Sequence, residues 1–303
     1  MAESRDRGPG TRPTLDPSEL AALADDVAAG DVVVLDATAQ LGPPTPQRRY
    51  PLDSGAALWE AAHIPGSRHV DLVDALSDPG AGFHLSVAAA PRMGAALAAV
   101  GVRPGARVVC YDSGDGSWAA RLWWILRGFD VPASVLDGGL AAWRAAGFDV
   151  VSGPAEPVAD PSAPLVLPGT ARGWATIDDV RTVVDGGPGT LVCALGEGQF
   201  AGVEPTRYPR PGHIPGSVNL PAHRVRDEAG RLADADLVRA VAEPVLGPPG
   251  PQPITLYCGM GVSAAGLALG LAGAGYTGLR IYDGSLEEWT ADPERPLDTG
   301  GAS

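Results

Sequence analysis

The chain has 303 residues and a formal net charge of −14, because 36 acidic side chains outnumber 22 basic ones. Nucleic acids and anionic lipids are bound mainly through Lys and Arg, so an acidic chain without a basic stripe matches neither. The chain has three cysteines, a small and odd number that argues against a disulfide framework and favours a reducing compartment. We find no signal-like N-terminus and no run of about 18 apolar residues, so we expect a cytoplasmic protein without membrane contact.

Short apolar, β-branched runs alternate with helix-like segments along the chain. In chain order the pattern predicts a helix over 18–29, a strand over 32–36, a helix over 91–100, a strand over 107–111, helices over 117–127 and 177–184, a strand over 191–194, a helix over 234–241, a strand over 254–257 and a helix over 263–274. This alternation predicts an α/β fold in which mainly parallel sheets carry helices on both faces.

The chain also repeats itself at a period of about 150 residues. The motif H-I-P-G-S occurs at 63–67 and again at 213–217, and D-G-G-L-A-A-W at 137–143 matches D-G-S-L-E-E-W at 283–289. The period is too long for a solenoid, so each copy should be a domain. We therefore predict a first domain over 14–150, a Pro-rich linker over 151–173 and a second domain over 174–297.

The chemistry is expected at Cys258, which follows the predicted strand 254–257. Ligands of open α/β sheets bind beyond the carboxyl ends of the strands. The loop Gly259–Met260–Gly261–Val262 comes next, and a helix begins near Ser263. Two glycines allow successive N–H groups to converge, and the helix start adds partial positive charge. We therefore expect Cys258 to act as a thiolate, and the same amides could hold the outer sulfur of a persulfide.

These residues resemble a known family. The motifs H-I-P-G-S, Y-D-S-G-D-G and L-D-G-G-L-A-A-W in the first half, and C-G-M-G-V-S-A and Y-D-G-S-L-E-E-W in the second, are similar to those of tandem-domain rhodanese-like sulfurtransferases. That family comprises the thiosulfate and 3-mercaptopyruvate sulfurtransferases. The resemblance implies two rhodanese-like domains, of which the first is degenerate and the second catalytic. It makes Cys258 the residue that carries sulfur, and residues 259–263 the loop that binds the substrate.

The mechanism implied by the resemblance is a double displacement. Cys258 would take sulfane sulfur from a small anionic donor, thiosulfate or 3-mercaptopyruvate, and would pass it to cyanide, a thiol or a thioredoxin-like protein. Neither a metal nor an organic cofactor is expected, since the covalent cysteine persulfide is the only intermediate. In the first copy Asp112 stands at the matching position, and a carboxylate cannot accept sulfane sulfur. We interpret Asp112 as a solvated loop acid, and Cys110 and Cys193, inside predicted strands, as core residues.

Two departures from the family pattern concern the donor. The uncharged loop after Cys258 resembles the mercaptopyruvate type, but Met260 stands where that type has Ser or Thr. A relay of that hydroxyl with a His and an Asp of the first domain is therefore incomplete. His63 and Asp53 could match its other two members, as possible contributors at the domain interface. His213 occupies the same motif as His63 without such a relay, which favours a role for both histidines in ordering the turn.

The family stretch G-R-F-x-G-x-E-P-x-P-R, whose arginines bind the donor, is G-Q-F-A-G-V-E-P-T-R-Y-P-R here. Gln199 replaces the first arginine, which should weaken the binding of a small anion because a charge-assisted contact is lost. Arg207 approximates the second arginine, and Arg210 is the alternative. Both could equally be solvated loop charges.

Two other functions remain open from the residues. Some phosphatases of this fold use Cys-x5-Arg, but the fifth residue after Cys258 is Ala264, which cannot clamp a phosphoryl group. A non-catalytic tandem module that stores sulfur or binds a partner is compatible with Gln199 and Met260. It predicts a persulfide on Cys258 with negligible turnover.

Overall fold

The computed structural model describes residues 12–45, 47–154, 164–228 and 230–301. The chain forms two compact units. The first comprises residues 1–42, 52–79 and 87–172, and the second comprises 43–51, 80–86 and 173–303. Two short loops of the first repeat, 43–51 and 80–86, thus belong to the second unit. Part of the predicted linker, 155–163, lies outside the described residues.

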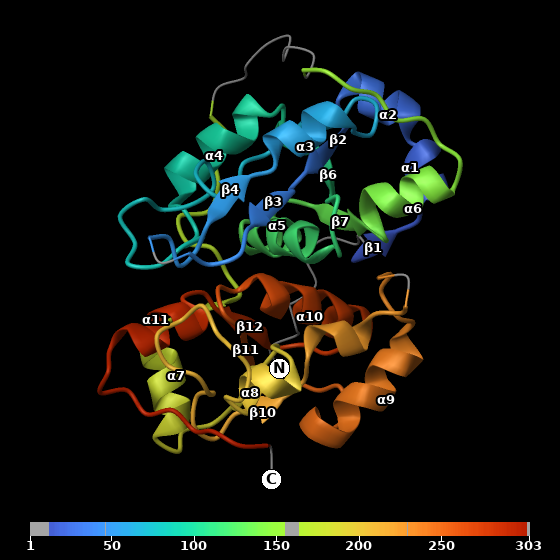
Figure 1. Cartoon of the computed structure of the whole chain (residues 1–303). Coiled ribbons are helices and arrows are strands. Elements are labelled where there is room, and N and C mark those ends of the chain that lie inside the picture. The colour runs from blue at the N-terminus through green and yellow to red at the C-terminus, as the bar shows by residue number, and fades with distance from the viewer. Residues whose placement is uncertain (1–11, 46, 155–163, 229, 302–303) are drawn as a thin grey trace. The chain divides into compact units, whose positions relative to one another are not determined.

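The first unit is built on a parallel five-stranded sheet of order β1-β7-β6-β2-β5, shown in blue and green in Figure 1. Its strands are β1 (Thr14–Leu15), β2 (Val32–Asp36), β5 (Arg68–His69), β6 (Arg107–Tyr111) and β7 (Ala133–Leu136), with an antiparallel pair β3 (Ala39–Leu41) and β4 (Leu52–Ser54) beside them. Its helices are α1 (Pro17–Ala21), α2 (Ala24–Ala29), α3 (Ala56–Ala61), α4 (Ala90–Ala99), α5 (Ser117–Gly128) and α6 (Gly139–Ala145).

The second unit repeats this design with a parallel sheet of order β10-β9-β11-β12-β8. Its strands are β8 (Trp174–Ala175), β9 (Thr190–Cys193), β10 (Val218–Asn219), β11 (Ile254–Tyr257) and β12 (Leu279–Tyr282). Its helices are α7 (Ile177–Val184), α8 (Glu197–Phe200), α9 (Ala235–Leu246), α10 (Val262–Gly273) and α11 (Ser285–Ala291), with a 3-10 turn η1 (Ala222–Val225). The α/β fold with helices on both faces of parallel sheets is confirmed.

Side chains alternate between the two faces of each sheet, and each unit has an apolar core between its sheet and its helices. In the first unit Val34 and Tyr111 pack with Trp59 and Trp143, which come from α3 and α6. In the second unit the matching core joins β9, β11 and β12 to α7, α8 and α11, with Trp289 fully buried within it. The central strands are buried on both faces, which explains why they read as continuous apolar runs.

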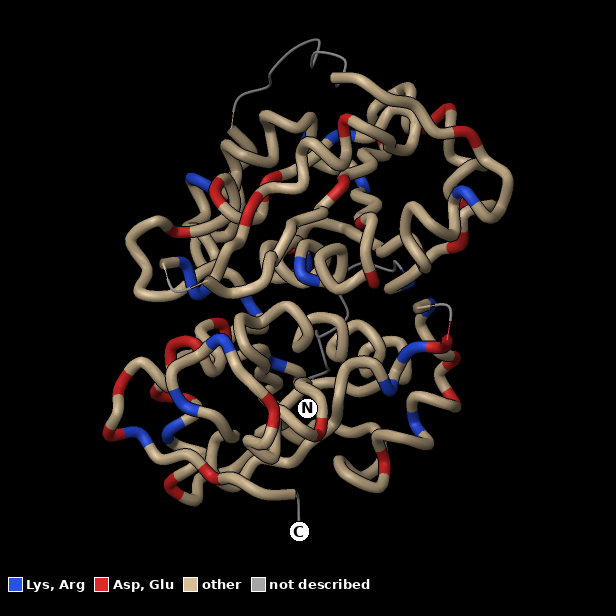
Figure 2. Tube along the Cα trace, in the orientation of Figure 1, with Lys and Arg blue, Asp and Glu red and all other residues tan. Residues whose placement is uncertain are grey.

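Most predicted elements agree with the structure to within one residue at each end, but the helix expected over 234–241 continues to Leu246 as α9. The strands β7 and β12 and the helices α3, α6 and α11 were not predicted. The helix expected over 18–29 is two helices, α1 and α2, separated by a turn at Ala22 and Leu23. The edge strands β1, β5, β8 and β10 have two residues each, too few for a period-two pattern to show in the sequence. In Figure 2 basic residues are interspersed with acidic ones rather than gathered along one element. Among the described residues, no helix is long and apolar enough to cross a membrane.

Candidate active site

Cys258 lies at the carboxyl end of β11, directly before the loop that leads into α10. Its side chain is almost buried, with 2 % of its surface exposed, and Met260 is buried beside it. Gly261 has φ +76° and forms the N-cap of α10, a left-handed conformation that glycine adopts without strain. The thiol therefore stands at the sheet edge where α/β proteins bind ligands and next to the start of a twelve-residue helix.

The backbone around Cys258 is held by the segment that opens α11. The Cys258 N–H donates to the Ser285 hydroxyl at 3.2 Å, and the Leu286 N–H donates to the Cys258 carbonyl at 3.0 Å. The Glu287 N–H donates to the Gly259 carbonyl, also at 3.0 Å. These bonds join the loop after β11 to the segment that opens α11.

Ser285 is a site residue that the sequence reasoning missed. It is fully buried with φ +48°, a conformation that costs a non-glycine residue about 1 kcal/mol or more. The first repeat has Gly139, at φ +54°, in the matching position of D-G-G-L. Comparing the two repeats could have found it, because a serine that replaces glycine at a positive φ needs a compensating contact. Here that contact is the hydrogen bond to the Cys258 backbone.

Asp112 occupies the corresponding place in the first unit and closes the corresponding loop. Its carboxylate accepts hydrogen bonds from the N–H groups of Gly114 at 2.8 Å, Gly116 at 3.0 Å and Ala119 at 2.9 Å. Asp112 is fully buried, so the interpretation as a solvated loop acid was wrong. The amides at the start of α5 compensate the loss of water. Burial nevertheless raises the pKa of Asp112 above its ordinary value, against the opposing effect of the three N–H groups.

The two loops have the same design and differ by one residue in length. Gly116, with φ +81°, is the fourth residue after Asp112, whereas Gly261 is the third after Cys258. In both units the segment that follows the next strand donates an N–H to the carbonyl of the key residue, Leu140 to Asp112 and Leu286 to Cys258. The loop of the first unit thus indicates what the loop of the second can bind, namely a negatively charged atom near the helix start.

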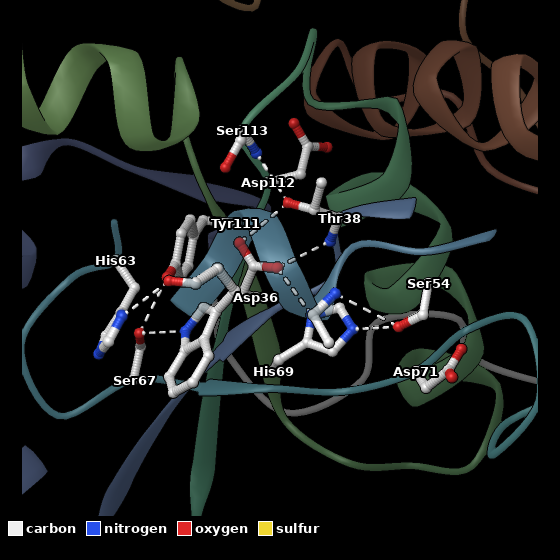
Figure 3. A network of polar contacts seen from close by, with 12 residues as sticks. Asp36, Thr38, Ser54, His63, Ser67, His69, Asp71, Tyr111, Asp112 and Ser113 are labelled. Atoms are coloured by element: carbon white, nitrogen blue, oxygen red, sulfur yellow. Dashed lines mark hydrogen bonds and ion pairs between the residues drawn. The ribbon is translucent and has the colours of Figure 1, made fainter. Parts of the chain in front are cut away.

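The carboxyl edge of the first unit also carries a polar network (Figure 3), which has no counterpart among the described residues of the second unit. His69 Nδ1 lies 2.9 Å from Asp36 Oδ1, and its Nε2 lies 3.0 Å from the Ser54 hydroxyl. Asp36 also accepts bonds from the Thr38 N–H and hydroxyl at 3.0 and 2.9 Å, and the Thr38 hydroxyl accepts the Ser113 N–H at 3.0 Å. These bonds tie β2, β4, β5 and the loop after β6 together.

In the second unit Cys193 and Asn219 occupy the register positions of Asp36 and His69. Asn219 bonds only backbone, through the carbonyls of Cys193 at 3.0 Å and Leu195 at 2.8 Å. Cys193 and Cys110 are fully buried, which confirms both as core residues. Burial raises the pKa of Cys193 to about 12 and also raises the pKa of Cys110, so neither thiol suits a nucleophile.

His63 and His213 make the same contacts in the two units. His63 Nδ1 lies 2.8 Å from the Trp59 carbonyl, and its ring stacks on Trp59 with centroids 3.9 Å apart. His213 Nδ1 lies 2.8 Å from the Phe200 carbonyl, and its ring stacks on Phe200 at 3.6 Å. The equivalence supports the turn-ordering interpretation. Asp53 lies in β4 and, like His63, belongs to the first unit.

The residues expected to bind the donor lie on α8 and on the loop that follows it. Gln199 is half-buried in α8. Arg207 lines a cavity of the second unit, together with Tyr208. Arg210 instead donates to the carbonyls of Asp292 and Arg295, both at 2.8 Å, and so caps the end of α11. Among the described residues, no cluster of His, Cys, Asp and Glu could hold a metal ion.

Comparison with known proteins supports the reading of the two units. The Rhodanese-like domain family matches residues 17–146 and 203–292. The chain is 33% identical over 292 residues to a "probable 3-mercaptopyruvate sulfurtransferase" of Pseudomonas aeruginosa, covering 92% of this chain and 96% of that protein. It is 31% identical over 251 residues to the 3-mercaptopyruvate sulfurtransferase of Homo sapiens, covering 80% and 82%.

Among solved structures, the chain resembles SseA from Escherichia coli, described as a 3-mercaptopyruvate sulfotransferase with the "Rhodanese" fold. The TM-score is 0.76 at 27% sequence identity, with 91% of this chain and 99% of that chain covered. The duplicated sheets, the Gly-rich loop after Cys258 and these similarities agree with one another. The chain therefore belongs to the tandem-domain rhodanese-like sulfurtransferases.

Proposed function

We propose that the chain transfers sulfane sulfur from thiosulfate or 3-mercaptopyruvate to cyanide or a thiol through a persulfide on Cys258. One observation carries the proposal: Cys258 ends β11 at the Gly-rich start of α10, and the first unit has a carboxylate at that place. The sequence therefore has one nucleophile for two copies of the fold. No cofactor takes part, because the sulfur is carried covalently.

In the first half-reaction the Cys258 thiolate attacks the sulfane sulfur of the donor. A bond forms between the two sulfur atoms while the bond from the sulfane sulfur to sulfite sulfur, or to C3 of mercaptopyruvate, breaks. The electron pair leaves on sulfite or on the carbon, which takes up the thiol proton to give pyruvate. In the second half-reaction cyanide or a thiolate attacks the outer sulfur, and the pair returns to Cys258.

Asp112 supports a persulfide at the second site by analogy of shape. An aspartate carries a negative oxygen two bonds beyond Cβ, and a cysteine persulfide carries a negative sulfur two bonds beyond Cβ. Three amides already hold that oxygen in the first unit. Gly261 and Ala264 stand at the places of Gly116 and Ala119 relative to the helix start. We infer that their N–H groups stabilise the outer sulfur, since amides fixed before the reaction need no reorganisation.

The deciding experiment is the formation of thiocyanate from cyanide, with thiosulfate and 3-mercaptopyruvate compared side by side. Cys258→Ser should abolish transfer from both donors, because a hydroxyl cannot replace the thiolate at neutral pH. Mass spectrometry of the donor-treated protein should find one added sulfur atom on Cys258. A Cys258→Ser protein with an undiminished rate would disprove the mechanism. A wild-type protein that forms the persulfide without turnover would instead be a sulfur-carrying module.

A further inference from the structure

A cavity of about 630 Å³ lies within the second unit, between the loop 43–51 and the loop that follows α8. Its polar lining comprises Thr45, Arg49, Glu204, Thr206, Arg207 and Tyr208, and prolines from both loops complete the wall. Prolines restrict the backbone, so the lining groups are held in place before any molecule binds. Two guanidinium groups and a phenol make the lining rich in hydrogen-bond donors.

Two tyrosine hydroxyls in this region have no hydrogen-bond partner among the described residues. They belong to Tyr208, which is 5 % exposed and lines the cavity, and to Tyr50, the neighbour of Arg49, which is 9 % exposed. A buried hydroxyl without a partner costs free energy, so native proteins seldom keep one unless another molecule completes it. The position of the Tyr50 ring is fixed by packing on His84, with centroids 5.1 Å apart. His84 is itself fixed by Glu287, whose Oε1 lies 2.5 Å from His84 Nδ1.

One lining residue of the cavity, Tyr208, connects it to the region of the proposed nucleophile. Tyr208 packs in the same core cluster as Tyr257, the residue before Cys258. The Glu287 that holds His84 is the residue whose N–H bonds the Gly259 carbonyl in the active loop. Burial raises the pKa of Tyr208, and electrostatic interaction with the neighbouring Cys193 and Cys258 adds smaller contributions. Tyr208 thus links the lining of the cavity to the core cluster that contains the residue before Cys258.

We propose that this cavity binds the carboxylate end of a low-molecular-weight thiol, the acceptor of the sulfur, through Arg49 and Tyr208, which both line it. The inference rests on the proposed function. Its size points to the acceptor, because cavities of this class hold molecules much larger than thiosulfate or mercaptopyruvate. Guanidinium and phenol groups both donate to carboxylate oxygens. The acceptor thiolate would then attack the outer sulfur, and the bond from that sulfur to Cys258 would break with its electron pair returning to Cys258.

The experiment compares acceptors on the full chain with thiosulfate as the donor. Reduced glutathione carries carboxylates, whereas 2-mercaptoethanol does not. In Arg49→Gln and in Tyr208→Phe the KM for glutathione should rise about tenfold, the loss of one charge-assisted bond, and the KM values for 2-mercaptoethanol and thiosulfate should not change. Tyr208→Phe should leave the protein as stable as the wild type, because its hydroxyl has no partner to lose within the described residues.

Tyr276→Phe is the matched control, since it removes a hydroxyl that donates to the Gly247 carbonyl at 2.8 Å. Neither residue lines the cavity. The substitution should lower stability without changing any KM. Equal changes for all acceptors, no change, or a change confined to thiosulfate would each overturn the inference. Binding of S-methylglutathione, measured by calorimetry, tests the cavity separately from the proposed function. If the wild type forms no persulfide, only the proposed function is disproved. Binding that weakens in Arg49→Gln supports the cavity, and equal binding in both proteins refutes it.

Discussion

The loops after β6 and after β11 both bring N–H groups together at the start of a helix, but they differ in the residue that faces those groups. Both follow the carboxyl end of a central strand, both reach a left-handed glycine, and both begin a twelve-residue helix. In the first unit the chain supplies its own anion, the Asp112 carboxylate, and three amides are satisfied by it. In the second unit the same position holds Cys258, which we propose gains an anionic outer atom when it carries sulfur. On this proposal the comparison teaches that one loop design serves stability in one copy and chemistry in the other.

The surroundings of the two loops follow the same division. Around Asp112 the polar side chains Asp36, His69, Ser54 and Thr38 bond one another and close the sheet edge (Figure 3). Around Cys258 the matching positions hold Cys193 and Asn219, which bonds only backbone, and Tyr208 keeps an unpartnered hydroxyl among the described residues. Polar groups that hydrogen-bond one another within a unit make that unit more rigid. A polar group without such a partner can instead bind another molecule.

The largest effect should come from placing an aspartate, the residue of the first unit, at position 258 of the second. In Cys258→Asp the carboxylate should fill the amides that we assign to the outer sulfur, and sulfur transfer should fall at least about a thousandfold because the nucleophile is lost. Thiocyanate formation measures the rate. Hydrogen exchange measured at Gly261 and Ala264 should slow at the same time.

Cys110→Ala is the control for the loss of a buried thiol, and it should keep its rate because Cys110 lies in the core of the first unit. If exchange at Gly261 and Ala264 were unchanged in Cys258→Asp, the two loops would not be equivalent as anion sites.

The next largest effect is on stability. Asp112→Ala should lower the free energy of unfolding by about 3–5 kcal/mol, because the buried N–H groups of Gly116 and Ala119 and the part-buried N–H of Gly114 lose their acceptor together. Urea unfolding followed by tryptophan fluorescence measures it, since five of the seven tryptophans belong to the first unit. The rate of sulfur transfer per folded molecule should not change.

Asp115→Ala tests whether any acid of this loop matters as much. Asp115 is exposed and, within the described part of the chain, accepts the Ser117 N–H alone at 3.0 Å, so its loss should cost less than about 1 kcal/mol. Equal costs for the two variants would show that the Asp112 bonds contribute little to the fold.

Much of this comparison was visible in the sequence, and its limits have physical causes. The duplication, the central strands and the place of Cys258 follow from repeated motifs and from apolar runs, which are properties of neighbouring residues. The burial of Asp112 was not predictable in that way. A charged residue in a glycine-rich loop usually faces water, and only the three-dimensional path of the loop brings three N–H groups onto one carboxylate.

The same limit applies to residues that act from a distance along the chain. Ser285 bonds the Cys258 N–H across 27 residues, and Tyr50 lies in a loop that joins the second unit although the first repeat encodes it. Neither contact leaves a pattern at helical or strand spacing. By contrast, the H-I-P-G-S repeat predicted a shared role for His63 and His213, because both copies had to solve the same local turn.

His63 and His213 allow the two units to be compared at one equivalent turn, with a smaller expected effect on stability. His63→Phe and His213→Phe keep the aromatic stacking but remove the bond to the carbonyl of Trp59 or Phe200. Each should cost about 1 kcal/mol, and turnover per folded molecule should stay at the wild-type level in both. A fall in kcat for 3-mercaptopyruvate in His63→Phe alone would assign His63 to proton transfer rather than to the turn. Thiosulfate serves as the control donor, since its sulfane sulfur leaves no proton to move.

The smallest expected effect is a pH dependence that belongs to Asp112 alone. Its pKa is raised in the folded protein, mainly by burial, so above the ordinary value of 3.8 the folded state binds this proton more tightly than the unfolded state. Over the interval between the two pKa values, stability therefore falls as pH rises. Asp112→Asn cannot titrate and should lack that slope. Subtracting its free energy of unfolding from that of the wild type, at matched pH in urea, should give a difference that shrinks as pH rises from about 4. A difference that grew instead would mean that the three amides outweigh burial, and that the first unit holds its carboxylate as a stable anion throughout.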